Sequence, residues 1–171
     1  MEPLGKRIVV VGVSASGKST FARKLAERTN LPLIHMDAIW WKPGWVEVSE
    51  EEATRQLEAL TQRDEWVIEG YIPDEARPFV FERAESIVYL DYPRMMGAFR
   101  YIRRWWKHRK NPRPELKGSP EKFSWKFLKL VWSKGEAISL DTSLTEVAEQ
   151  KKIRVIKKPQ EAANLLKPSL R

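Results

Sequence analysis

The chain has 171 residues, no cysteine and a net charge of +8. This length suits one domain with a sizeable core, here expected to span residues 1–171, and the lack of cysteine excludes disulfide bonds and thiolate metal sites within it. Residues 1–7 lead straight into a short apolar run, and no run approaches the length of a membrane helix, so we expect a cytoplasmic protein without a signal peptide or membrane span.

The first informative stretch is a glycine loop between a predicted strand and a predicted helix. Apolar, β-branched residues fill 8–11, and apolar residues recur at helical spacing from 19 to 28. Between them stands Gly12-Val13-Ser14-Ala15-Ser16-Gly17-Lys18-Ser19-Thr20, which fits the G-x-x-x-x-G-K-[ST] pattern of a phosphate-binding loop (P-loop). In that geometry Lys18 reaches the β- and γ-phosphates of a nucleotide and the Ser19 hydroxyl binds Mg²⁺. Backbone N–H groups and the helix N-terminus hold the phosphates.

Strands and helices alternate along the rest of the chain. Further strands are predicted at 31–37, 66–70, 86–91 and 153–156, and further helices at 50–63, 75–83, 94–110, 120–134, 140–150 and 159–166. Ser49, followed by Glu52, predicts a capping box at the start of the second helix. Pro43 and Gly44 predict a turn between tryptophans. The alternation predicts an α/β fold, a three-layer α/β/α sandwich around a five-stranded parallel sheet.

Chemistry-bearing residues follow the carboxyl end of every predicted strand. Such ends meet at one edge of a parallel sheet, where ligands bind. The residues there are 12–19, Asp37, Glu69, Gly70, Tyr71, Asp91, Lys157 and Lys158. We interpret Asp91 as a structural residue of the turn before Pro93. Asp37 can bind or deprotonate an acceptor hydroxyl, or it can cap the segment that follows. Glu69 can hold Mg²⁺ through water, or it can pair with a lysine.

Positive charge is concentrated in the second half of the chain. Residues 1–85 hold 11 Lys/Arg and 15 Asp/Glu, whereas residues 86–171 hold 20 and 8. Residues 94–113 carry eight Lys/Arg and no acid. This asymmetry indicates a polyanionic partner, either a nucleoside triphosphate enclosed by a basic lid or a nucleic acid. The stretch 103–107, with two tryptophans among basic residues, suits stacking on bases as well as a lid helix.

Several segments together resemble the adenylate kinase-like P-loop kinases and, more closely, the group called DNA topology modulation proteins. Besides the P-loop, the resemblance is carried by the tryptophan-rich stretch 35–45, by 66–71, by 90–94 and by 119–123, and it covers residues 8–166. It implies binding of Mg²⁺ and ATP, with ATP contacts from Gly12, Ser14, Ala15, Ser16, Gly17, Lys18, Ser19, Thr20, Arg100, Lys157 and Lys158. Residues 94–135 would form the lid.

The resemblance also implies roles on the acceptor side of the site. In adenylate kinases an Asp-Gly-Phe-Pro-Arg segment follows the third strand, whereas this chain has Glu69-Gly70-Tyr71-Ile72-Pro73 and Asp74 at the arginine position. Arg77 is the candidate replacement for that arginine. The family's catalytic arginine corresponds to Arg104, with Arg109 and Arg113 in the lid. We therefore expect catalytic roles for Lys18, Arg104, Arg109 and Asp37, metal contacts from Ser19 and Glu69, and acceptor contacts from Asp37, Trp41, Lys42, Glu69, Gly70, Tyr71 and Arg77.

The predicted function is transfer of the γ-phosphoryl group of Mg·ATP to a nucleotide, a nucleoside or another small acceptor by a monomer or homodimer. Two alternatives stay open. One is a nucleic-acid-associated protein that binds ATP at the P-loop. The other is a nucleotide-binding protein with weak ATPase activity. Trp40, Trp41 and Trp45 can wall the acceptor pocket, but at least one of them is expected to belong to the core.

Overall fold

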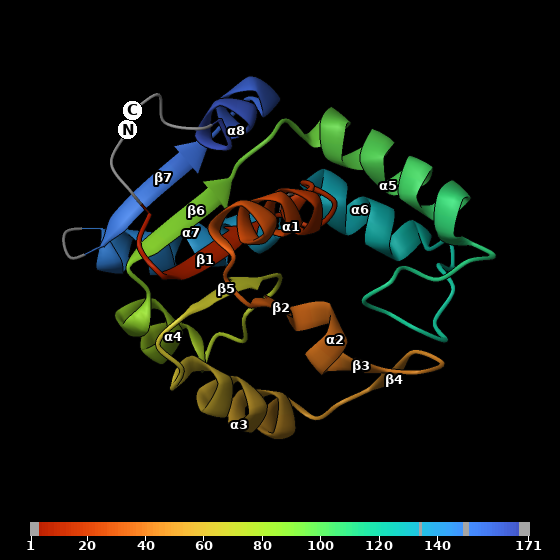
Figure 1. The fold of residues 1–171 in the computed structure, drawn as a ribbon. Coiled ribbons are helices and arrows are strands. Elements are labelled where there is room, and N and C mark those ends of the chain that lie inside the picture. The colour runs from red at the N-terminus through yellow and green to blue at the C-terminus, as the bar shows by residue number, and fades with distance from the viewer. Residues whose placement is uncertain (1–3, 134, 149–150, 168–171) are drawn as a thin grey trace.

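The computed structural model describes residues 4–133, 135–148 and 151–167, and its centre is a five-stranded parallel sheet (Figure 1). The strands are β1 (Arg7–Gly12), β2 (Leu33–His35), β5 (Trp66–Glu69), β6 (Ser86–Leu90) and β7 (Lys152–Ile156). They lie in the order β2-β5-β1-β6-β7, with β1 paired in parallel to both β5 and β6. The predicted fold class and all five predicted strands are confirmed. The central position of β1 places the loop after it in the middle of the carboxyl edge.

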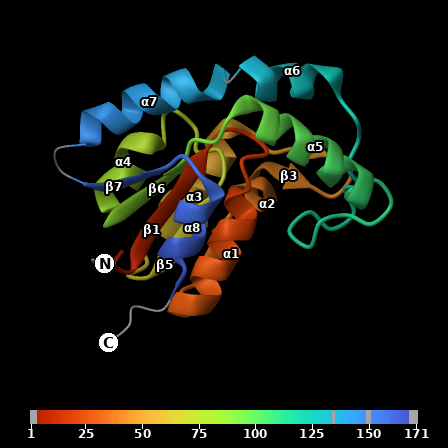
Figure 2. The same ribbon diagram turned by 90° about the horizontal axis from the view of Figure 1, so that it is seen from above.

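Helices cover both faces of the sheet (Figure 2). One face packs against α1 (Lys18–Thr29) and α8 (Pro159–Leu165), and the other against α3 (Glu50–Thr61), α4 (Arg77–Arg83) and α7 (Gly135–Val147). Within β1, Ile8 and Val10 belong to the first core and Val9 and Val11 to the second. Successive side chains of a strand point to opposite faces, so a continuous β-branched run supplies both cores.

The remaining elements lie beyond the carboxyl edge of the sheet (Figure 1). They are the short helix α2 (Met36–Trp40), the hairpin of β3 (Trp41–Lys42) and β4 (Val46–Glu47), and the helices α5 (Arg94–His108) and α6 (Trp125–Ser133). The sequence analysis missed α2 and the hairpin, although it placed a turn at Pro43 and Gly44. That turn joins β3 to β4, and Gly44 has a φ of 85°.

Two predicted helices begin elsewhere than expected. The helix predicted from residue 120 starts at Trp125, because the backbone N–H groups of Glu121 and Ser124 bond to the His108 carbonyl and the Tyr101 hydroxyl of α5. The Ser124 hydroxyl then accepts a hydrogen bond from the Phe127 N–H, as a helix cap does. The helix predicted from residue 140 starts at Gly135, and its predicted end at 150 lies outside the described residues.

The start of α3 agrees with the sequence in part. The Ser49 hydroxyl accepts a hydrogen bond from the Glu52 N–H at 3.3 Å, so the predicted N-cap is present. The Glu52 carboxylate accepts hydrogen bonds from Arg55 and from Gln56, the latter at 2.7 Å. In the predicted capping box the Glu52 carboxylate would accept a hydrogen bond from the Ser49 backbone N–H, but here it binds Arg55 and Gln56 instead.

Candidate active site

The P-loop requires glycine at both of its motif positions. Gly12 ends β1 with a φ of 148°, and a Cβ built on it would lie 2.5 Å from the Leu90 carbonyl oxygen of β6. Gly17 is the N-cap of α1 with a φ of 96°, and a Cβ there would lie 3.1 Å from a guanidinium nitrogen of Arg100. A side chain at position 12 would therefore collide with the β6 backbone, and a side chain at position 17 would be held in a strained backbone conformation.

Three features of the loop fit an anionic group. The Lys18 ammonium donates hydrogen bonds to the carbonyls of Gly12 at 2.8 Å and Val13 at 3.0 Å, so it is held over the loop. The buried hydroxyl of Ser16 has no hydrogen-bond partner among the described residues. The N-cap Gly17 supplies no side-chain acceptor to the first turn of α1. A helix N-terminus without a side-chain cap, beside a fixed ammonium group, binds phosphates.

A cavity of about 1030 Å³ opens at the carboxyl edge of the sheet around this loop. Ten Lys/Arg and four Asp/Glu line it, so its lining carries net positive charge. Most of the predicted site residues line the same cavity: Gly12, 14–20, Asp37, Trp41, 69–71, Arg77, Arg100 and Arg104. The structure therefore brings together residues that lie as far as 92 positions apart in the sequence, from Gly12 to Arg104.

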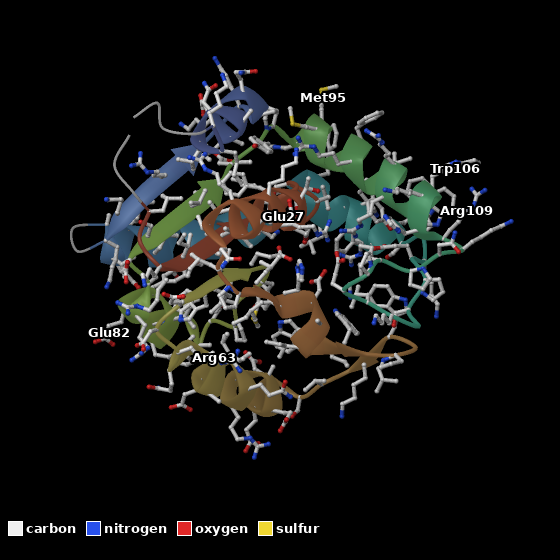
Figure 3. The ribbon with its side chains drawn as sticks, in the orientation of Figure 1. Glu27, Arg63, Glu82, Met95, Trp106 and Arg109 are labelled. Atoms are coloured by element: carbon white, nitrogen blue, oxygen red, sulfur yellow. The ribbon has the colours of Figure 1, made fainter. Side chains whose placement is uncertain are left out.

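Four predicted site residues do not line the cavity. The Arg109 guanidinium stacks over the Trp106 ring at 3.6 Å, and Figure 3 shows both at the outer end of α5, directed away from the centre. Lys42 lies exposed on β3. Lys157 and Lys158 are exposed before α8, and their backbone N–H groups donate to the Glu161 carboxylate at 2.8 and 3.3 Å. The predicted ligand contacts of these four residues remain untested predictions.

The cavity contains a group of five charged side chains in contact, here called the charge network: Asp37, Arg104, Arg113, Glu115 and Glu121. Glu115 also pairs with Arg23 at 3.3 Å. The Arg113 guanidinium lies 2.9 Å from the Asp37 carboxylate, 2.9 Å from Glu121 and 3.5 Å from Glu115. Arg104 lies 3.1 Å from the same oxygen of Glu121. Neither Nε atom is aligned for a hydrogen bond to Glu121, so these two contacts are between charges. The sequence analysis assigned Arg113 to the lid and assigned no role to Glu115 or Glu121.

Burial and neighbouring charges change the pKa values of the two arginines in opposite directions. Burial lowers the pKa of Arg104, and the Glu121 carboxylate offsets only part of that effect. Burial acts in the same direction on Arg113, but the charges of Asp37 and Glu121 outweigh it and raise its pKa. Both guanidinium groups are charged at neutral pH. Arg104 is therefore a cation in a partly desolvated setting, where its field acts strongly on neighbouring groups.

Asp37 and Glu69 have specific partners at the ends of neighbouring strands. Asp37 lies inside α2, whose N-cap is His35, so the capping interpretation of Asp37 is not supported and its carboxylate binds Arg113. Glu69 is buried at the end of β5, and its carboxylate lies 2.6 Å from Nδ1 of His35 at the end of β2. Register pairs these two residues directly across the sheet. Histidine thus takes the place of the lysine considered as a partner for Glu69.

Arg100 and Arg77 are held by the protein itself. Arg100 donates to the Ser16 carbonyl, and its guanidinium lies 4.8 Å from the Tyr92 ring centroid. Burial lowers the pKa of Arg100 and raises that of Tyr92. Arg77 is buried, where it donates to the Ile72 carbonyl at 3.1 Å and to the Ser143 hydroxyl at 3.4 Å. The Arg77 guanidinium also pairs with Asp74 at 2.8 Å. Arg100 therefore links α5 to the P-loop, whereas Arg77 is held at the start of α4.

The loop between α5 and α6 is fastened to the β3–β4 hairpin by contacts that we call the lid clasp. The buried Ser119 hydroxyl accepts hydrogen bonds from the backbone N–H groups of Gly44 at 3.0 Å and Trp45 at 3.2 Å. The Trp45 indole donates to the Pro120 carbonyl at 2.7 Å. Trp41 and Trp45 meet edge to face with centroids 5.5 Å apart and line the cavity, whereas Trp40 packs against the core.

Replacing Ser119 with alanine should loosen the lid clasp. The substitution removes an acceptor from the Trp45 N–H and one of two acceptors from the Gly44 N–H, which keeps the Gly118 carbonyl at 3.2 Å, and the loss of such a hydrogen bond costs about 0.5–1.5 kcal/mol. We expect faster hydrogen exchange at the Gly44 and Trp45 amides and a lower Tm, with unchanged exchange at the sheet amide of Val67 as internal control. Unchanged protection at residues 44 and 45 would show that the hydroxyl does not hold the hairpin.

The described residues hold no ready-made metal site and no membrane-spanning helix. No three His, Asp or Glu side chains gather there to form a protein-only metal site. Mg²⁺ keeps several waters and needs only one or two protein oxygens beside substrate phosphates, so the predicted contacts of Ser19 and Glu69 remain open. Among the helices described, none is both long and apolar enough to cross a membrane.

Comparison with known proteins identifies the fold. No protein-family model and no curated protein matches the sequence. A shikimate kinase from Acinetobacter baumannii in complex with shikimate matches with a TM-score of 0.60 and 19% identity over 95% of this chain and 89% of that one. A sugar kinase from Janibacter sp. HTCC2649 matches at 0.59 and 19% over 94% and 91%. A gluconokinase from Sinorhizobium meliloti 1021 matches at 0.54 and 19% over 96% and 89%. Nearly the whole chain therefore has the fold of a small P-loop kinase.

Proposed function

We propose that this protein is a small-molecule kinase that transfers the γ-phosphoryl group of Mg·ATP to a hydroxyl of an acceptor. The observation that carries the proposal is the shared cavity. The P-loop with Lys18 and the charge network with Arg104 and Asp37 line the same space, although Arg104 lies 86 positions after Lys18 in the sequence. Phosphoryl transfer depends on positioning and charge neutralisation, which these groups supply. The similar solved structures are kinases whose names give three different acceptors.

Each side of the cavity has its own role in this proposal. Backbone N–H groups of the P-loop and Lys18 hold the phosphates, and Arg104 stabilises charge on the group in transfer. Asp37 accepts the hydrogen bond of the acceptor hydroxyl and orients it. Bound Mg·ATP supplies the phosphoryl group, and Ser19 and the water shell held by Glu69 would contact its metal ion. We call the part of the cavity lined by Asp37, Trp41, Trp45, Tyr71 and Arg113 the acceptor end.

The proposal is tested by following the label of γ-labelled ATP in the presence of a panel of nucleosides, nucleotides, sugars and sugar acids. We expect the label to appear in an acceptor, and ADP release to rise when that acceptor is added. Release of labelled phosphate at one unchanging slow rate, whatever is added, would instead support the alternative of a weak ATPase. Because the Lys18 ammonium group is held over the P-loop, we expect any turnover of ATP to depend on Lys18.

A second candidate function is favoured by the outer surface of α5. Arg103 and Lys107 of α5, which also line the cavity, and Lys110 just after α5 are exposed near Trp106, which is 63% exposed. Cations beside an aromatic ring suit a nucleic-acid surface, and the finer resemblance to DNA topology modulation proteins belongs to this candidate. Binding of duplex DNA that weakens steeply with salt, and that is lost in the triple variant Arg103→Ala, Lys107→Ala, Lys110→Ala, would support it. Binding of single strands alone would point to base stacking by Trp106.

A further inference from the structure

The arginines at the acceptor side of the cavity are already neutralised by the protein. Of the arginines that line the cavity, Arg77 stacks over the Tyr71 ring, Arg113 pairs with Asp37, and Arg104 shares Glu121 with Arg113. Arg23 also lines the cavity and pairs with Glu115 at 3.3 Å. Arg113 has three carboxylates within 3.5 Å, Arg104 has Glu121 at 3.1 Å, and Arg77 has Asp74 at 2.8 Å. An anionic acceptor would have to take one of these cations from its partner.

Separating the Arg113 guanidinium from its carboxylate partners costs free energy. Arg113 is 8% exposed and Glu121 is 6% exposed, and the Glu115 side chain is 5% exposed. A carboxylate left unpaired at this depth carries a desolvation penalty that a new ion pair elsewhere does not offset. Asp37, Glu115 and Glu121 line the cavity beside these arginines, so an anion that displaces one of these carboxylates is repelled by the carboxylate it displaces. The electrostatics therefore disfavour an acceptor that carries negative charge.

Aromatic rings form the other part of the acceptor end. Trp41, Trp45 and Tyr71 line the cavity together with the carboxylate of Asp37. Trp45 has a φ of 65°, a strained conformation for a bulky side chain, and the lid clasp holds it there. Tyr71 is positioned through its carbonyl, which accepts a hydrogen bond from the Trp40 indole at 3.2 Å. Flat rings beside hydrogen-bond acceptors suit a ring compound with an apolar face and hydroxyl edges.

We propose that the acceptor is an uncharged, hydroxyl-bearing ring compound, a free sugar or a nucleoside, and not a sugar acid or a nucleotide. This inference rests on the proposed kinase function and narrows its acceptor. The aromatic walls contact the ring, and Asp37 accepts a hydrogen bond from the hydroxyl that attacks. The hydroxyl oxygen forms the new bond to the γ-phosphorus, the bond to the bridging oxygen of ADP breaks, and the hydroxyl proton leaves to Asp37 or to solvent.

The test compares related acceptors that share a ring and differ by one anionic group. Glucose is paired with glucuronate, and each nucleoside with its 5′- and its 3′-monophosphate, so that each hydroxyl stays free in one of the two nucleotides. Both γ-phosphoryl transfer and equilibrium binding in the presence of Mg·ADP are measured on the full chain. We expect the uncharged member to have at least about tenfold higher kcat/KM, a difference of about 1.4 kcal/mol. The sugar and nucleoside arms distinguish the two sources of the ring.

A variant of the charge network provides the second readout. Glu115→Gln removes one charge that neutralises both Arg113 and Arg23, so it should raise kcat/KM and affinity for the anionic member relative to the uncharged one several-fold. Glu58→Gln, on the exposed surface of α3, is the matched control and should leave the ratio unchanged. A wild-type preference for the anionic member, no response to either uncharged class, or an unchanged ratio in Glu115→Gln overturns the inference. Failure to bind Mg·ATP would instead overturn the proposed function.

Discussion

Replacing Lys18 with alanine should lower the rate of phosphoryl transfer by at least about 10²-fold, the loss seen when one preorganised donor to a developing charge is removed. The ammonium group is held by the Gly12 and Val13 carbonyls at 2.8 and 3.0 Å, so it needs little rearrangement to meet phosphate oxygens. ADP formation at saturating acceptor measures the rate, and titration with ADP measures the loss of nucleotide affinity.

The control for this variant is a lysine of the same charge on another helix. Lys129→Ala changes an exposed residue of α6 and should leave both quantities within about twofold of the native protein, as substitutions far from a site do. The Tm of Lys18→Ala should stay close to the native value, because the hydrogen bonds of its ammonium group to Gly12 and Val13 lie within the loop itself. Unchanged turnover and unchanged ADP affinity in Lys18→Ala would refute the assignment of the P-loop as the ATP site.

Replacing Arg104 with alanine should reduce kcat by about 10³-fold and leave KM for the acceptor nearly unchanged, as loss of a transition-state arginine does. Arg104 lies in the cavity between the rings of Tyr101 and Phe127, at 5.6 and 5.4 Å. This packing fixes the guanidinium, and the partly desolvated setting strengthens its interaction with charge. Arg104→Lys keeps the charge but not the planar fork, so it should recover only a minor part of the rate.

Folding effects can be separated from catalytic effects in this variant. Glu121 keeps Arg113 as a partner at 2.9 Å when Arg104 is removed, so the network retains a cation beside each carboxylate. Arg94→Ala, an exposed arginine in the first turn of the same helix, is the matched control and should leave kcat unchanged. A kcat within about threefold of the native value in Arg104→Ala, with an intact Tm, would make Arg104 a structural residue.

The predicted fold depended on local patterns, and these were sufficient for the sheet. A short β-branched run such as Ile8 to Val11, bounded by a glycine loop, favours a strand buried on both faces, and the helical spacing after it lets α1 pack back on the sheet. The same alternation placed Asp37 and Glu69 at the carboxyl edge, where both now line the cavity. The short helix α2 and the hairpin escaped detection, because elements of five and two residues carry too few positions for a periodicity.

The partners of the site residues depended on tertiary structure. Arg113 stands between two prolines, and its partner Asp37 lies 76 positions earlier, so no local pattern connects them. The Glu69 carboxylate contacts His35 because the pairing register of β2 and β5 places these two residues side by side. That register depends on which faces of the strands are buried, which is decided when the sheet packs. Arg109 follows Arg104 in the same basic stretch, but it lies just after the end of α5, and its guanidinium stacks on the Trp106 ring.

The sequence by itself determined the parallel sheet, the phosphate-binding loop and the residue types at the carboxyl edge. Those features follow from spacing along the chain, because side-chain periodicity and glycine geometry act within a few residues. Only the tertiary structure decided which cations are neutralised by the protein and which rings wall the acceptor end. Ion pairs and ring contacts depend on distances between segments far apart in the chain, and those distances exist only after the lid clasp brings residues 44–45 and 118–120 together.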